Sequence, residues 1–329
     1  MNSPRRTRIM ALARHEHRAA VRSRVLVGLL AVLVVTTIAS VYIAAVDYRS
    51  QLADYQAYRS AAQARGLQRI APSPLALLSL LRGAMEYLEI IGAVIAITLG
   101  YLSVSRERVN RTLPLIRSRP VTSGELAAGS VLGAVGVIST LVAATAVVAV
   151  VCLGAIGNDW VSGDQIVKLL LAYVAATVYM TVFYCLGVIT TARSRVAANG
   201  LMLALGIWLV VVLILPQIGD TLDADNQVPG GLFSSLTLNK PQEEQVLSHF
   251  GTYETFRTGI EATSFSKHFE RFAFAMTDVK EKYRGFTLAH LLDVKRIEVL
   301  WLSAYAVAAG AALRRSFHRQ PNVPQGGQS

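Results

Sequence analysis

Six long apolar runs, separated by polar segments, dominate the pattern of this chain. About 20 apolar residues, rising ~1.5 Å each, cross the ~30 Å hydrocarbon core of a bilayer. Five runs reach that length: residues 25–46, 84–104, 126–156, 166–191 and 197–218. The sixth, residues 299–313, reaches it only by including upstream residues such as Ile297. The pattern therefore predicts an all-α membrane protein with six transmembrane helices.

Local features refine this picture. Residues 75–81 are apolar but too few to cross, so we expect them to lie on the outer surface or dip into it. Pro216 lacks a backbone N–H group, which predicts that the fifth span stops or kinks there. Gly129, Gly133 and Gly136 in the third span could let a neighbouring helix approach closely, although glycine is frequent in membrane helices anyway.

The first 24 residues are strongly basic, with seven arginines and a single acid, Glu16. Arg14, Arg18 and Arg22 recur at every fourth position and therefore share one face of a helix. An amphipathic helix lying on the cytoplasmic membrane surface would place these arginines against anionic head groups. A solvated basic tail that only fixes orientation is the alternative.

Residues 219–298 form the longest polar segment, which we expect to be a largely helical extracytoplasmic region. Five of its side chains share one helical stripe, namely Phe269, Phe272, Met276, Val279 and Tyr283. This stripe predicts a helix that rests on the outer membrane face or packs in a small bundle. The tail 316–329, with its Pro, Gly and Gln residues, is predicted to be disordered.

Composition excludes an ordinary soluble domain, because 53% of the residues are hydrophobic and the mean hydropathy is +0.44. The net charge of +11 does not indicate nucleic-acid binding, since the arginines cluster beside the apolar runs without interleaved aromatic residues. Lys and Arg are concentrated in alternate short segments, which predicts a multi-pass plasma (inner) membrane protein with both termini in the cytoplasm. The chain then divides into the amphipathic helix 1–24, spans one to five within 25–218, and the last span at 299–315.

Residues 105–125 connect the second and third spans on the cytoplasmic side. Five arginines make this segment too charged for hydrocarbon, and Pro114 and Pro120 prevent one continuous helix. Thr122 or Ser123, with Glu125 close behind, can cap the next helix at its amino end. These features indicate a cytoplasmic connector made of a short helix broken by turns.

The connector resembles the signature loop of ABC exporter permeases of the second superfamily, the type V group. That loop reads Glu-Arg-x-x-Gly-Thr-Leu, a few apolar residues, then Pro-Val-Ser-Arg-x-Glu-Leu and Gly-Lys. The chain matches this pattern at Glu107, Arg108, Thr112, Leu113, Leu115, Ile116, Pro120, Val121, Thr122, Glu125, Leu126 and Gly129, and departs from it at Arg111, Arg117, Ser123 and Ser130. A looser likeness, to the run before the last span of gliding-motility and nitrous-oxide-accessory permeases, rests on Ser264, His268, Phe269 and Glu270.

The resemblance implies a permease subunit that pairs with a second copy of itself or a similar permease, and with two copies of an ABC ATPase subunit. ATP and Mg would bind to that partner, because the chain contains no P-loop motif and we expect it to bind no cofactor. The amino-terminal helix and the loop 105–125 would contact the ATPase. Pro120 would set the turn and Glu107 and the arginines would make charge-assisted contacts, while Leu113, Leu115 and Ile116 would fill an apolar cleft.

Other candidate residues leave alternatives open. Glu86 and Glu89 share a helical face and could contact a cationic substrate or a proton, although carboxylates at a span's edge more often lie in water among the head groups. Tyr179 could line a pathway or simply pack. The histidines lack compact metal-ligand spacing and no nucleophile elbow is present, so no metal or catalytic site is predicted. A complex that senses or regulates an extracytoplasmic process remains the rival to transport, and a membrane-embedded enzyme would depend on Glu86 and Glu89 alone.

Overall fold

The computed structural model describes residues 3–66, 76–109, 122–157, 161–221 and 263–318, together with isolated positions between 236 and 259. Regular structure in these ranges is entirely helical. The elements in chain order are α1 (Ser3–Val21), α2 (Arg24–Ala64), η1 (Leu77–Leu81), α3 (Arg82–Val109), α5 (Ser123–Gly157), α6 (Gly163–Arg193), α7 (Ala197–Trp208), η2 (Leu209–Ile214), α8 (Leu215–Thr221), α12 (Phe265–Met276), η4 (Glu281–Tyr283), α13 (Leu288–Val294) and α14 (Arg296–His318).

Within the described residues, six helices are long and apolar enough to cross a membrane, which confirms the predicted all-α, six-span fold. Their bounds are Arg24–Ala64, Leu77–Val109, Ser123–Ala155, Gly163–Arg193, Ala197–Gly219 and Arg296–Phe317. The second and fourth of these spans are the most buried, and the fifth and sixth are the least. The bundle is therefore built around α3 and α6, with α7 and α14 at its periphery.

The central pair, α3 and α6, meets through two glycines. A β carbon at Gly100 of α3 would lie 2.9 Å from the amide nitrogen of Val188, and one at Gly187 of α6 would overlap the carbonyl oxygen of Ile97. Backbone therefore packs directly on backbone, as small residues allow in membrane helices. Side chains above and below this crossing, such as Ile97 and Val188, complete the core.

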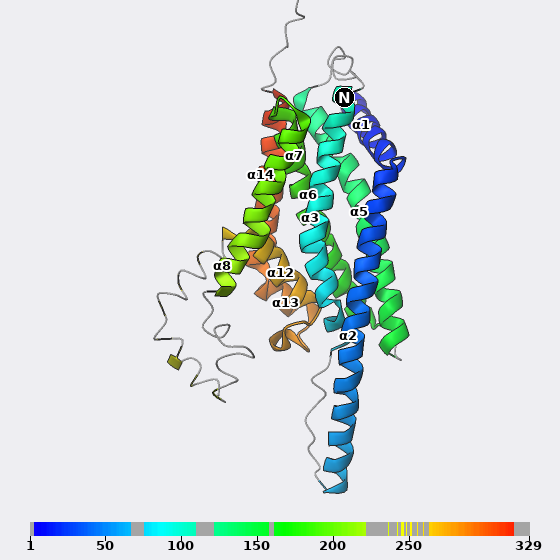
Figure 1. Ribbon diagram of the computed structural model, residues 1–329, viewed down its shortest axis with the longest axis vertical. Coiled ribbons are helices and arrows are strands. Elements are labelled where there is room, and N and C mark those ends of the chain that lie inside the picture. The colour runs from blue at the N-terminus through cyan, green and yellow to red at the C-terminus, as the bar shows by residue number, and fades with distance from the viewer. Residues whose placement is uncertain are drawn as a thin grey trace, which may run out of the picture.

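The first span is much longer than its apolar run. Instead of ending near Val46, α2 continues through the polar sequence to Ala64, where Arg65 caps it and Gly66 adopts a left-handed conformation. Its 41 residues rise about 60 Å at 1.5 Å per residue, roughly twice the thickness of the hydrocarbon core. Its last turns project beyond the rest of the bundle (Figure 1).

The fifth and sixth spans also depart from their predicted ends. The fifth span does not stop at Pro216. The π-helical segment η2 lies just before this proline, and α8 continues past it to Thr221. A widened π turn accommodates a proline ring and its missing N–H group, which a regular α-helix does not. The last span is a full-length helix, because α14 starts upstream at Arg296 and runs to His318.

The helix α12 enters the bundle instead of resting on a surface. Nine of its twelve residues are buried, so almost its whole circumference touches α6, α14 and α3. Phe269 stacks on Tyr179 with ring centroids 4.7 Å apart, and Tyr179 lies near the midpoint of α6. The predicted continuous stripe is interrupted, because the helix ends at Met276, and Val279 and Tyr283 lie beyond it. In Figure 1, α12 and α13 occupy the half of the bundle away from α1.

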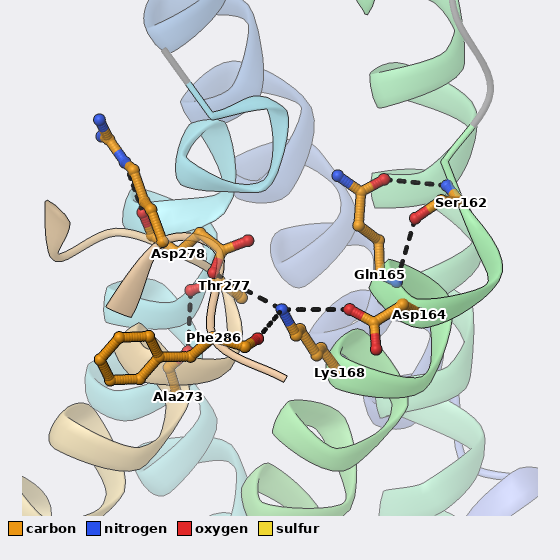
Figure 2. Close-up of polar contacts among 9 residues, drawn as sticks. Ser162, Asp164, Gln165, Lys168, Ala273, Thr277, Asp278 and Phe286 are labelled. Atoms are coloured by element: carbon orange, nitrogen blue, oxygen red, sulfur yellow. Dashed lines mark hydrogen bonds and ion pairs between the residues drawn. The ribbon is translucent and has the colours of Figure 1, made fainter. Parts of the chain in front are cut away.

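A buried lysine ties the end of α12 to α6 (Figure 2). Lys168 Nζ lies 3.1 Å from both the Asp164 carboxylate and the Phe286 carbonyl oxygen, and 4.0 Å from the Asp278 carboxylate. Asp278 follows α12 in a left-handed conformation (φ 51°), and the Val279 N–H group donates back to the Phe274 carbonyl, as in a Schellman motif. Burial raises the pKa of the Asp278 carboxyl group, and the Lys168 and Arg284 cations oppose that rise.

Substituting Lys168 with methionine should lower the free energy of unfolding by about 3 kcal/mol, because it leaves the buried Asp278 carboxylate without its closest ammonium group. Thermal unfolding of the detergent-solubilised protein measures this loss. Asp164→Asn is the matched control. Its side chain is 56% exposed, so removing that ion pair should cost below about 1 kcal/mol. Equal losses in the two variants would contradict the buried-cation interpretation.

The ends of four helices lie together at one end of the bundle. The start of α1, the end of α3, the start of α5 and the end of α14 all lie at the top of Figure 1. Consistent with this, the Arg314 side chain of α14 lies 3.6 Å from a β carbon built on Gly124 of α5. The two described ends of the 105–125 connector, at Val109 and Thr122, therefore lie at the same end of the bundle as the start of α1.

Candidate functional site

The amino-terminal helix α1 packs along the first turns of α5 on a row of glycines. A β carbon at Gly133 would lie 2.6 Å from the Glu16 β carbon and 2.9 Å from the Ala13 carbonyl oxygen. Gly129 faces Leu12 and Gly136 faces His17 in the same way. The hypothesis that these glycines admit a neighbouring helix is confirmed, and that helix is α1.

Glu125 anchors the start of α5. Its backbone N–H group bonds to the Thr122 hydroxyl (3.2 Å), and its carboxylate accepts from the Thr122 N–H group (2.9 Å), which completes a capping box. The same carboxylate pairs with Arg8 of α1 at 2.9 Å, and the Glu125 side chain is only 2% exposed. Glu125 therefore joins the end of the connector to α1.

Arg108 anchors the other end of the connector. Its guanidinium group donates to the carbonyl oxygens of Thr191 (2.7 Å), Ala192 (3.0 Å) and Ser194 (3.0 Å). These carbonyls end α6, where unpaired acceptors and the negative end of the helix dipole favour a cation. Arg108 thus fixes the last turns of α3 to the α6–α7 turn.

A polar network beneath α1 connects three spans. Glu16 of α1 accepts a hydrogen bond from Ser103 of α3 and pairs with Arg106 at 3.5 Å. The Ser130 hydroxyl of α5 and the Tyr184 hydroxyl of α6 are 3.0 Å apart. Glu16, Ser103, Arg106 and Tyr184 line a cavity of about 20 Å³, enough for one water molecule.

Sequence reasoning named only part of this site. Glu107 lies half-buried in the last turn of α3, and Arg108 and Glu125 hold the two ends of the connector. Thr112, Leu113, Leu115, Ile116, Pro120 and Val121 lie outside the described residues, so their predicted contacts stay predictions. Arg8 and Glu16 were missed as contact residues. The available signal for Glu16 was that it is the lone acid among seven arginines.

The three residues proposed for a pathway separate into two environments. Glu86 pairs with Arg82 at 2.9 Å and keeps 43% of its side chain exposed. Glu89, three residues later, is buried, and its backbone carbonyl accepts a hydrogen bond from the Tyr179 hydroxyl at 3.0 Å. The structure thus brings Glu89 and Tyr179 together and leaves Glu86 at the surface.

His268 and His290 pack on aromatic rings. His268 stacks on Trp301 with centroids 5.4 Å apart, and His290 lies 4.6 Å from Phe286. Over the described ranges, no group of three or more His, Cys, Asp or Glu side chains could hold a metal ion.

Six long apolar helices, with a polar site at one end of the bundle, define a multi-pass membrane protein. Residues 10–318 match a family described as "ABC-2 family transporter protein", and the chain belongs to this family. It is accordingly a membrane permease of an ABC system, a class that works with an ABC ATPase partner. A search among curated proteins found no match.

Proposed function

We propose that this chain is the membrane-spanning subunit of an ATP-driven transporter of the type V class in the plasma membrane, with both termini in the cytoplasm. Two copies of a separate ATPase would bind ATP and Mg, and a second permease copy would complete the pathway. The likeness to gliding-motility and nitrous-oxide-accessory permeases is part of this proposal, and Ser264, one residue of that likeness, caps α12.

The observation that carries the proposal is the anchoring of both connector ends. Arg108 joins one end to α6, and Glu125, in the first turn of α5, joins the other end to α1. A partner that moves residues 110–121 would therefore pull on α1, α3, α5 and α6 together. Coupling requires such an element, with different contacts in two states, between the ATPase and the spans.

A complex that senses or regulates an extracytoplasmic process without transport is the second candidate. The observation that favours it is the projecting part of α2, residues 47–64, whose side chains are mostly exposed. This part offers a helical surface outside the bundle on which another protein could bind.

The test is to purify the tagged protein in mild detergent and measure the ATPase activity of what co-purifies. Wild type should bring down an ATPase subunit. The double variant Glu107→Ala/Pro120→Ala should lose that subunit or leave its activity unresponsive to the permease. Arg193→Ala, which removes an exposed arginine at the same end of the bundle, is the control and should behave as wild type. Wild type without an accompanying ATPase would overturn the proposal.

A further inference from the structure

A groove of about 370 Å³ lies between α1 and α5 on the outside of the bundle. Two arginines near the start of α1, Arg5 and Arg6, line it together with Ile9, Met10 and Leu132. The groove therefore has two chemically different parts, a pair of guanidinium groups and an apolar part shared by the two helices. The Met10 and Leu132 side chains are 42% and 49% exposed, so the apolar part is open to the surroundings of the protein.

The two guanidinium groups of the groove carry charge that the described residues do not balance. Both side chains are exposed, and neither forms a hydrogen bond or ion pair with another described residue. Glu125, the acid at this end of α5, is already paired with Arg8 at 2.9 Å. The groove therefore suits an anion. A phosphate group fits best, because its oxygens accept paired hydrogen bonds from the planar guanidinium fork.

The two parts of the groove follow the direction from water to hydrocarbon. The helix α1 runs parallel to α5, because Gly129 faces Leu12 and Gly136 faces His17. The 33-residue span formed by α5 is about 50 Å long, so about 10 Å at each end extends beyond a ~30 Å hydrocarbon core in which it is centred. Leu132, about 13 Å into the helix, then lies at the edge of the hydrocarbon. The two arginines, near the start of both helices, lie at the level of the head groups.

An amphiphile with an anionic head group matches this order of charged and apolar surface. We propose that the groove binds one anionic phospholipid, with its phosphate group against Arg5 and Arg6 and an acyl chain along Met10 and Leu132. A zwitterionic lipid fits less well, because its ammonium group would lie near two uncompensated cations. An acidic protein segment matches the arginines but not the apolar end, which reaches hydrocarbon. Binding needs neither ATP nor a partner, so this inference goes beyond the proposed function and does not depend on it.

Native mass spectrometry of the delipidated full-length protein in detergent measures the binding. Phosphatidylglycerol should occupy one saturable site, and phosphatidylcholine should bind at least about tenfold more weakly. Arg5→Gln/Arg6→Gln should weaken phosphatidylglycerol binding roughly thirtyfold, because each arginine beside an anionic lipid contributes about a fivefold gain.

Arg18→Gln/Arg22→Gln is the matched control, since it removes the same charge from exposed positions at the far end of α1. These positions lie about 18 Å or more from Arg6 along the helix, beyond the ~10 Å over which salt screens exposed charges. The control should therefore change phosphatidylglycerol binding by less than about twofold. An equal loss in the two double variants, or equal binding of phosphatidylcholine to wild type, would overturn the proposal.

The apolar part of the groove has its own variant. Leu132→Ser should weaken phosphatidylglycerol binding about threefold or more, because it removes apolar contact with the acyl chain and leaves the arginines in place. Inorganic phosphate should not displace the lipid. Phosphatidylglycerol should also raise the unfolding temperature of wild type but not that of Arg5→Gln/Arg6→Gln. Full binding to Leu132→Ser, or displacement by inorganic phosphate, would show that the groove holds only a free anion.

The same double variant distinguishes a lipid from a protein in the groove. If Arg5→Gln/Arg6→Gln keeps phosphatidylglycerol binding but loses the co-purifying ATPase, an acidic surface of that subunit occupies the groove and the lipid proposal is wrong. Loss of the lipid with the ATPase retained supports the proposal. Wild type that binds phosphatidylglycerol without an accompanying ATPase would remove only the proposed transport function.

Discussion

Replacing Gly187 with leucine is expected to prevent the bundle from folding, the largest effect that we predict for a single substitution. A β carbon at this position would overlap the Ile97 carbonyl oxygen and lie 3.1 Å from the Ile97 α carbon. These are backbone atoms, so no side-chain rotation can make room, and α3 and α6 would have to separate. Overpacking of ordinary cores costs about 1–3 kcal/mol, and we expect a loss above this range here.

The yield of monodisperse protein in size-exclusion chromatography, followed by thermal unfolding, measures this effect. Gly206→Leu serves as the control, because no atom lies within 4 Å of a β carbon built at Gly206 of α7. That variant should purify like wild type. A Gly187→Leu protein of normal yield and stability would show that the two central helices tolerate a wider separation.

Arg108→Ala should give the second largest effect, a loss of about 2–4 kcal/mol in stability together with loss of the co-purifying ATPase activity. Hydrogen bonds from a charged donor contribute about 1.5–3 kcal/mol each, and solvent replaces part of this at a half-buried site. Three carbonyl acceptors at the end of α6 lose their donor at once. Arg108→Lys should recover only part of the loss, because an ammonium group cannot reproduce the planar fork.

Arg193→Ala is again the control, since Arg193 is an arginine of α6 itself, in the last turn of the helix that Arg108 of α3 contacts. Its side chain is exposed, so only the interaction with the helix dipole is lost, about 0.3–1 kcal/mol. The difference between the two variants isolates the carbonyl contacts of Arg108. If both variants lost the same stability, the positive charge alone, and not the hydrogen bonds of the Arg108 guanidinium group, would hold α3 to α6.

The spans were predictable because a bilayer demands long apolar runs, and all six were found by that rule. The cap at Thr122 and Glu125 was also predictable, since its residues lie within one turn of sequence. The end of α2 was not, because the polar residues after Val46 carry no helix stop until Gly66. Hydropathy marks where a helix leaves hydrocarbon, whereas local backbone chemistry decides where it ends.

Long-range contacts were beyond sequence reasoning. The amphipathic stripe of α12 is equally suited to a membrane surface and to a gap between spans, so its burial required the positions of α3, α6 and α14. Glu86 and Glu89 lie about 60° apart around α3, which is close enough to suggest one environment. The approach of α12 covers only Glu89. Likewise, no sequence signal joins Arg108 to the carbonyl of Thr191, 83 positions later, because that contact depends on how α3 and α6 pack.

The length of α2 gives the protein a lever. The helix follows α1 directly, and Ser23 caps it at their junction, so a displacement of α1 acts on the near end of a rigid rod. Residues 47–64 extend about 27 Å at 1.5 Å per residue, so a tilt of about 10° would move the far tip by roughly 5 Å. The near arm, residues 24–46, is about 34 Å long, so a rearrangement of about 6 Å at one end of the bundle would be carried, nearly undiminished, to the part of α2 beyond the other end.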